Sequence, residues 1–179
     1  GTANLNLESW FITKTEGIES EYTDDLDNIL STLQYQTKPM PTYSQFVNAF
    51  PKLDYPSYPG YYKQMPASQV YPIVGGTLES LYNNSGKDNG PYRNACTVRW
   101  SLGMNGAGIL IPNNSLSRQG ANVLGQPRYY YLQAKTAGDF MQKTFGSPNH
   151  KLEGTDANNS STVMNSLNGK TGIYVIVNN

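Results

Sequence analysis

Apolar residues recur at intervals of three and four in several stretches of the chain, which predicts helices with one buried face. The predicted helices cover residues 21–33, 42–50, 95–104 and 136–145. Asp24, Asp25 and Asp27 lie in the first turn of the first one, where negative charge suits the helix dipole. The last one ends at Gly146, because glycine readily terminates a helix.

Other apolar runs are too short for helices and predict strands. Residues 172–177 form a β-branched run typical of a buried strand, and residues 129–132 carry three tyrosines that suit a pleated surface. Residues 109–112 are a third, shorter candidate. Residues 5–18 show no single period, so no element is predicted there.

Proline and glycine divide the first half of the chain. Pro39 and Pro41 predict a segment boundary near residue 40. Residues 51–72 contain five prolines among many tyrosines, which predicts an ordered loop packed on the domain. Gly75 and Gly76 allow a phosphate-binding loop or a turn into a short helix, and the missing P-loop lysine favours the turn.

Length and charge exclude several classes of protein. The 179 residues suffice for one domain with its own core. Thirteen basic and thirteen acidic side chains are scattered, which argues against a nucleic-acid surface. No apolar run approaches the roughly 18 residues of a membrane span. One histidine, one cysteine and dispersed carboxylates give no metal-ligand spacing, and we expect no cofactor.

Cys96 is the candidate nucleophile. It follows a turn rich in glycine and asparagine at the start of a predicted helix, where unpaired N–H groups favour the thiolate. A buried, inert thiol is the alternative. His150 could act as its base, but its surroundings are typical of a solvated surface histidine. Ser101, Ser115 and Ser117 lack a nucleophile-elbow pattern and are interpreted as surface or capping residues.

Four segments together carry a resemblance to a known family: residues 41–50, 73–76, 92–101 and 167–175. In this order they resemble the fourth family of type VI secretion amidase effectors. The resemblance implies an α+β, papain-like cysteine amidase fold, with the nucleophile at a helix N-terminus packed on an antiparallel sheet. We expect this domain over residues 41–179, with residues 1–40 as an N-terminal extension or helix.

The resemblance also implies an activity: cleavage of the D-Glu–diaminopimelate bond in the peptide stem of peptidoglycan, with Cys96 as the nucleophile. The family's base is a histidine in a Gly-His motif on the strand after the Gly169–Val175 segment, followed by an acidic residue. The sequence ends before such a motif, so we expect the domain to lack its C-terminal part. His150 precedes that segment and does not take the role.

The expected partners follow from the same resemblance: the peptide stem, an immunity protein, and a second polypeptide that carries the catalytic histidine. Neither nucleic acid nor a membrane is expected. The protein should be secreted or exported and act in the periplasm or on the cell wall. Two alternatives stay open, a non-catalytic module that binds the cell wall or a partner, and a cysteine peptidase that acts on proteins.

Overall fold

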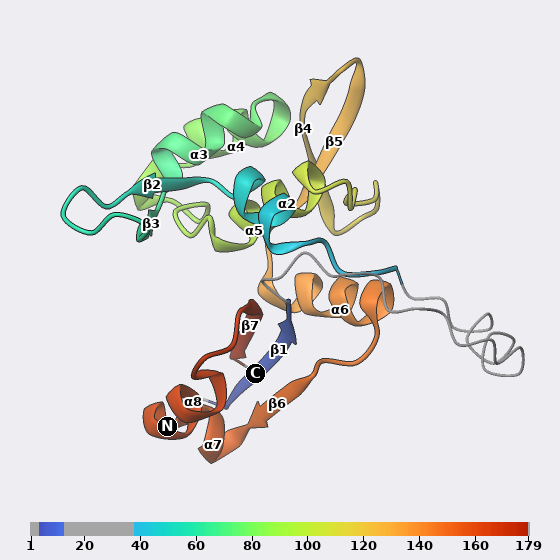
Figure 1. Ribbon diagram of the computed structural model, residues 1–179. Helices are drawn as coiled ribbons and strands as arrows, with labels where there is room; N and C mark the ends of the chain where they lie inside the picture. Colours follow the sequence, from blue (N-terminus) through green and yellow to red (C-terminus); the bar gives the residue numbers. More distant parts are fainter. Residues whose placement is uncertain (1–3, 13–37, 179) are drawn as a thin grey trace, which may run out of the picture. The chain divides into compact units, whose positions relative to one another are not determined.

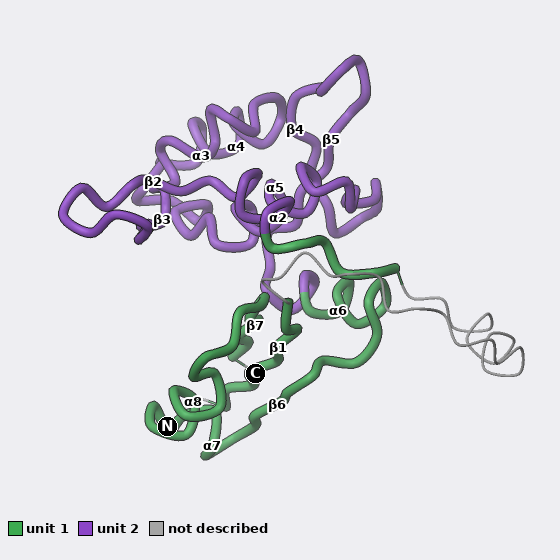
Figure 2. The backbone as a smooth tube through the Cα atoms, viewed as in Figure 1, with its two compact units in different colours: residues 1–43, 138–179 green, residues 44–137 purple. Residues whose placement is uncertain are grey.

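The computed structural model describes residues 4–12 and 38–178 (Figure 1). The chain forms two compact units, unit 1 with residues 1–43 and 138–179, and unit 2 with residues 44–137 (Figure 2). Among the described residues, no helix has the length and apolar character needed to cross a membrane. The predicted helix over residues 21–33 lies outside them. The predicted domain limits at residue 40 stay a prediction.

Unit 1 contains a three-stranded antiparallel sheet in the order β6-β1-β7. Its strands are β1 (Leu5–Phe11), β6 (His150–Glu153) and β7 (Gly172–Asn178). The predicted strand at 172–177 is confirmed, but its full burial is not. Ile173 and Val175 are buried while Ile176 is exposed, because β7 is an edge strand with only one covered face.

Three helices accompany this sheet in the sequence. Helix α6 (Ala134–Phe145), predicted from its apolar period, begins in unit 2 and continues into unit 1. A side chain at Gly138 would lie 3.3 Å from Val175 Cγ1, so the glycine lets α6 approach β7 closely. Helices α7 (Gly154–Asn158) and α8 (Ser160–Leu167) follow β6, and neither was predicted.

The core of unit 2 is built on α3 (Ala67–Val74), α4 (Gly76–Asn84) and the residues around Ala95 and Val98. Tyr71 and Tyr82 stack within it, with ring centroids 4.4 Å apart. The Tyr82 hydroxyl pairs at 2.5 Å with Asp88, in the short 3₁₀ helix Lys87–Asn89. The buried members of the cluster are Ala67, Val70, Tyr71, Val74, Leu78, Tyr82, Ala95, Val98 and Tyr130.

Helix α5 (Cys96–Gly106) packs on the hairpin of β4 (Ser117–Val123) and β5 (Gln126–Tyr131). The fully buried Ser101 hydroxyl accepts the Tyr131 backbone N–H at 3.0 Å. One turn later Asn105 donates to the Tyr129 carbonyl at 2.9 Å. The helix at 95–104 and the strand at 129–132 are confirmed. The surface or capping role expected for Ser101 is wrong, because its hydroxyl ties α5 to β5.

The predicted turn before α4 is also confirmed. Gly75 and Gly76 have φ values of 65° and 61°, in the left-handed region that glycine tolerates. A Cβ atom at Gly76 would overlap the backbone carbonyl of Gly120 on β4. The glycine pair therefore serves a sharp chain reversal and a close helix–strand approach, and α4 packs directly on β4.

Two predictions in unit 2 are wrong. The loop predicted at 51–72 contains a hairpin of β2 (Lys52–Asp54) and β3 (Tyr62–Gln64) and most of α3. Pro66 lies at the N-cap of α3, where a missing N–H is tolerated, whereas Pro72 lies inside that helix. Residues 109–112 form no strand because the Ile111 N–H is bonded to the Asn105 side chain. Helix α2 (Tyr43–Ala49) matches its prediction.

Candidate active site around Cys96

The Cys96 thiol is exposed at the first residue of α5, in unit 2. This is the position expected for a nucleophile, and it excludes the alternative of a buried, inert thiol. Its sulfur lies 3.7 Å from the hydroxyl of Thr97. The site therefore offers an accessible sulfur at a helix N-terminus, where the helix dipole favours negative charge.

The backbone amide of Cys96 is already engaged. The Asn94 side-chain oxygen accepts the Cys96 N–H at 3.1 Å, while Ala95 at the N-cap offers no side-chain bond. Asn94 thus satisfies one of the four N–H groups that a helix start leaves without intrahelical partners. The Cys96 N–H is therefore not available to donate a hydrogen bond to a substrate oxygen.

A buried cation lies one helical turn beyond the thiol. Arg99 is 8% exposed, and its Nη2 donates to Oε1 of Gln64 at 2.9 Å. Its Nε and Nη1 are buried and have no hydrogen-bond partner in the described part of the chain. Burial lowers the pKa of Arg99, whereas the nearby ionisable groups of Cys96 and Tyr71 raise it. The guanidinium thus sits within electrostatic reach of the sulfur.

Tyr71 anchors the loop that leads to the nucleophile. Its hydroxyl donates to the Tyr92 carbonyl at 2.9 Å, four residues before Cys96. Burial, followed by the nearby hydroxyls of Tyr92 and Tyr82, raises the pKa of Tyr71 to about 12. The phenol therefore stays a neutral donor at physiological pH, and it joins the α3–α4 core to the start of α5.

His150 occupies a different setting from the expected one. It is the first residue of β6 in unit 1, opposite Ser9 of β1, and its Nε2 is buried without a partner among residues 4–12 and 38–178. The ring is therefore less solvated than expected, since the residue is half-buried and its Nε2 is covered. Unit 2, which holds Cys96, contains no histidine.

The remaining sequence candidates do not join the site. Ser117 is buried in a turn with Asn114, whereas Ser115 is exposed. Over residues 4–12 and 38–178, no three His, Cys, Asp or Glu side chains are grouped in a way that could hold a metal ion. The chemistry available around Cys96 is therefore that of the thiol, the helix amides and the Arg99 cation.

Comparison with known proteins bears directly on this region. Residues 92–179 match the family model described as type VI secretion system (T6SS), amidase effector protein 4. The predicted family resemblance is confirmed. The matched region starts four residues before Cys96 and includes α5, the β4–β5 hairpin, α6 and the β6 to β7 segment.

Among solved structures, the chain matches the effector Tae4 from Salmonella typhimurium in complex with the immunity Tai4 from Enterobacter cloacae. The sequences are 20% identical, the TM-score is 0.45, and the match covers 62% of this chain. It spans 59% of the length of that effector. No curated protein matches the chain. The mixed architecture of helices and antiparallel sheets agrees with the α+β class expected from the sequence.

Sequence reasoning missed three residues that shape this site: Asn94, Arg99 and Tyr71. Arg99 carried a signal, since a cation three residues after a cysteine lies on the same helix face. The contact of Arg99 with Gln64 depends on the β2–β3 hairpin, which the proline-rich sequence did not predict. The Tyr71 contact joins residues 21 positions apart and had no local signal.

Proposed function

We propose that this protein is a peptidoglycan amidase that cleaves the D-Glu–diaminopimelate bond of the peptide stem, with Cys96 as its nucleophile. The observation that carries the proposal is the exposed Cys96 thiol at the start of α5, inside the region matched by the amidase effector family. An amide bond in a polymeric, solvent-accessible wall suits a thiol that is itself open to solvent.

The reaction follows the chemistry of a cysteine acyl transferase. A base removes the thiol proton, and the thiolate attacks the D-Glu carbonyl carbon to form a tetrahedral oxyanion. Collapse of the tetrahedral intermediate breaks the C–N bond. The amine of diaminopimelate leaves with the proton that the base had taken from the thiol. Water then hydrolyses the thioester and releases the D-Glu carboxylate and the free thiol.

The first turn of α5 supplies the donors for the oxyanion. Since Asn94 occupies the Cys96 amide, we assign this role to the following amides, those of Thr97 and Val98. Preorganised N–H donors of this kind contribute roughly 10²–10³-fold in rate. The positive end of the helix dipole acts in the same direction, since the charge that develops is negative.

The base comes from outside unit 2, because residues 44–137 hold no histidine. The resemblance to the family implies that this base is the histidine of a Gly-His motif. The same proposal includes a papain-like arrangement of the active site. It also includes export to the periplasm or cell wall and inhibition by an immunity protein.

A second candidate is a binding module that holds the peptide stem without cleaving it. The absence of histidine from the unit that contains Cys96 favours this candidate. Both candidates predict that the protein binds the stem. Only the amidase predicts that the thiol is consumed and regenerated in turnover.

Chromatography of muropeptides tests the proposal. Peptidoglycan is incubated with the wild-type chain, with Cys96→Ala and with Ser115→Ala, an exposed serine that serves as the matched control. The amidase predicts that D-Glu–diaminopimelate linkages disappear with the wild type and the control, and persist with Cys96→Ala. Binding without cleavage by any of the three supports the module. Cleavage of a generic protein substrate but not of peptidoglycan indicates a peptidase.

A further inference from the structure

A row of exposed tyrosines lies on the connection between β2 and β3. We call residues 52–64 the tyrosine hairpin, and its loop projects from the rest of unit 2 (Figure 1). Tyr55, Tyr58, Tyr61 and Tyr62 are 44%, 60%, 71% and 50% exposed. So many accessible aromatic rings on one short loop indicate a binding surface, because exposed apolar area is otherwise unfavourable.

The loop holds these rings in a fixed arrangement. Tyr55 and Tyr61 are joined by a backbone hydrogen bond of 3.1 Å, and Tyr58 bonds to both of them at 3.0 Å. The Tyr58 ring lies 5.4 Å from that of Tyr55 and 6.2 Å from that of Tyr61, between ring centroids. Pro56 and Pro59 restrict the backbone further. A preformed aromatic surface loses little entropy when it binds.

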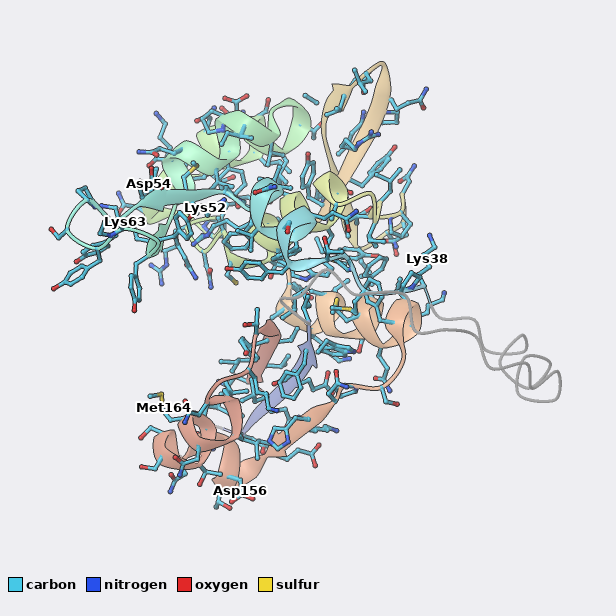
Figure 3. The ribbon with its side chains drawn as sticks, viewed as in Figure 1. Lys38, Lys52, Asp54, Lys63, Asp156 and Met164 are labelled. Atoms are coloured by element: carbon cyan, nitrogen blue, oxygen red, sulfur yellow. The ribbon has the colours of Figure 1, made fainter. Side chains whose placement is uncertain are left out.

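A lysine of β2 contacts one of the rings. Lys52 and Asp54 lie on one face of the hairpin with Tyr62, and Lys63, which pairs with Leu53, lies on the opposite face; all three charged residues are labelled in Figure 3. The Lys52 ammonium lies over the Tyr62 ring, 5.2 Å from its centroid. This surface suits a polymer that combines sugar faces, which pack on aromatic rings through their C–H groups, with carboxylates, which pair with ammonium groups.

The hairpin is connected to the nucleophile through one hydrogen bond. Gln64, the last residue of β3, accepts from Arg99, and Arg99 lies one helical turn after Cys96. In peptidoglycan the bond to be cleaved is only two residues from the sugar that carries the stem. A surface that holds the sugar must therefore be linked closely to the nucleophile, and the base of this hairpin, at Gln64, is joined to the helix that begins with Cys96.

We propose that the tyrosine hairpin binds the glycan strand of peptidoglycan and so presents the attached stem to Cys96. The choice of polymer rests on the function proposed above, and the surface itself lies outside the family match at residues 92–179. Tyr58 and Tyr61 are the central contacts, since they are the most exposed of the four rings.

Calorimetric titration with soluble glycan strands that carry no peptide stems tests this proposal. All proteins carry Cys96→Ala, so binding is measured without turnover. The test variant adds Tyr58→Ala and Tyr61→Ala, a second adds Tyr58→Phe and Tyr61→Phe, and the control adds Leu124→Ala, which removes a 95% exposed side chain from the β4–β5 turn. Thermal unfolding of each variant checks that the fold is intact.

We expect the Tyr58→Ala and Tyr61→Ala pair to weaken glycan binding by about tenfold or more, because each lost aromatic contact lowers the affinity several-fold. The phenylalanine pair and the Leu124 control should bind within about twofold of the parent. Glycan binding that survives the alanine pair overturns the proposal, as does the absence of any binding of stem-free glycan by the parent protein. Failure of the amidase assay with intact tyrosine-dependent glycan binding overturns only the proposed function.

Discussion

The Arg99 guanidinium donates from Nη2 to Oε1 of Gln64, 2.9 Å away, and so joins helix α5 to the end of strand β3. Arg99 is buried, and this is the partner that the described residues provide for its side chain. The contact links the tyrosine hairpin to the helix that begins with Cys96. It therefore couples the fold of the hairpin to the geometry of the candidate site.

Gln64→Ala should lower the free energy of unfolding by about 1 to 2 kcal/mol, because it removes the acceptor from a buried charged donor. Urea denaturation measures the change. Gln69→Ala is the matched control, since Gln69 is an exposed glutamine on α3. Equal stabilities of the two variants would contradict a role for the Arg99 contact.

Gly76→Ala should destabilise the protein more than Gly125→Ala. Both glycines have positive φ, at 61° and 76°, so both substitutions carry a similar backbone cost of about 1 kcal/mol. Only at Gly76 would the added methyl group meet another backbone, that of Gly120, while nothing lies within 4 Å at Gly125. The difference between their unfolding free energies isolates the close packing of α4 on β4, and a difference near zero would argue against it.

Ser101→Ala should cost about 1 to 3 kcal/mol of stability, because it leaves the buried Tyr131 N–H without an acceptor. Ser115→Ala, an exposed serine in the same unit, should change stability by less than about 0.5 kcal/mol. Chemical denaturation compares the two. A small effect at Ser101 would mean that water or another group replaces the hydroxyl.

Stability should fall as the pH rises from about 10 to 12. Burial raises the pKa of Tyr71 to about 12, and a hydrogen bond to Asp88 raises that of Tyr82 to about 12. An unfolded tyrosine ionises near pH 10, so in this window the unfolded state binds fewer protons and becomes favoured. Denaturation at several pH values should show a smaller fall for Tyr71→Phe. If the stability of Tyr71→Phe falls with pH as steeply as that of the wild type, Tyr71 does not contribute to the pH dependence.

Local sequence patterns were sufficient for elements whose own residues decide their structure. Helices α5 and α6 combine an apolar period with a glycine at or near the end, and β7 is a continuous β-branched run. Elements stabilised by distant partners were missed. Strand β1 has no clear period of its own, and it is defined by pairing with β6 and β7 about 140 to 170 residues later.

The candidate site divides in the same way. Cys96 was identified from its local sequence alone, because a helix start after a turn is a local property. Tertiary context decided the roles of Arg99 and His150. Arg99 is buried and bonded to a hairpin that the proline-rich sequence did not predict, and His150 is half-buried on a strand with its Nε2 covered.

Hydrolysis of a defined stem peptide tests the central claim most directly. The substrate is L-Ala–D-Glu–diaminopimelate, and the masses of its products are recorded with the wild-type chain, Cys96→Ala and Ser115→Ala. The account predicts L-Ala–D-Glu and free diaminopimelate with the wild type and with Ser115→Ala, and uncleaved peptide with Cys96→Ala. Equal product from the wild type and from Cys96→Ala would contradict Cys96 as the nucleophile of an amidase.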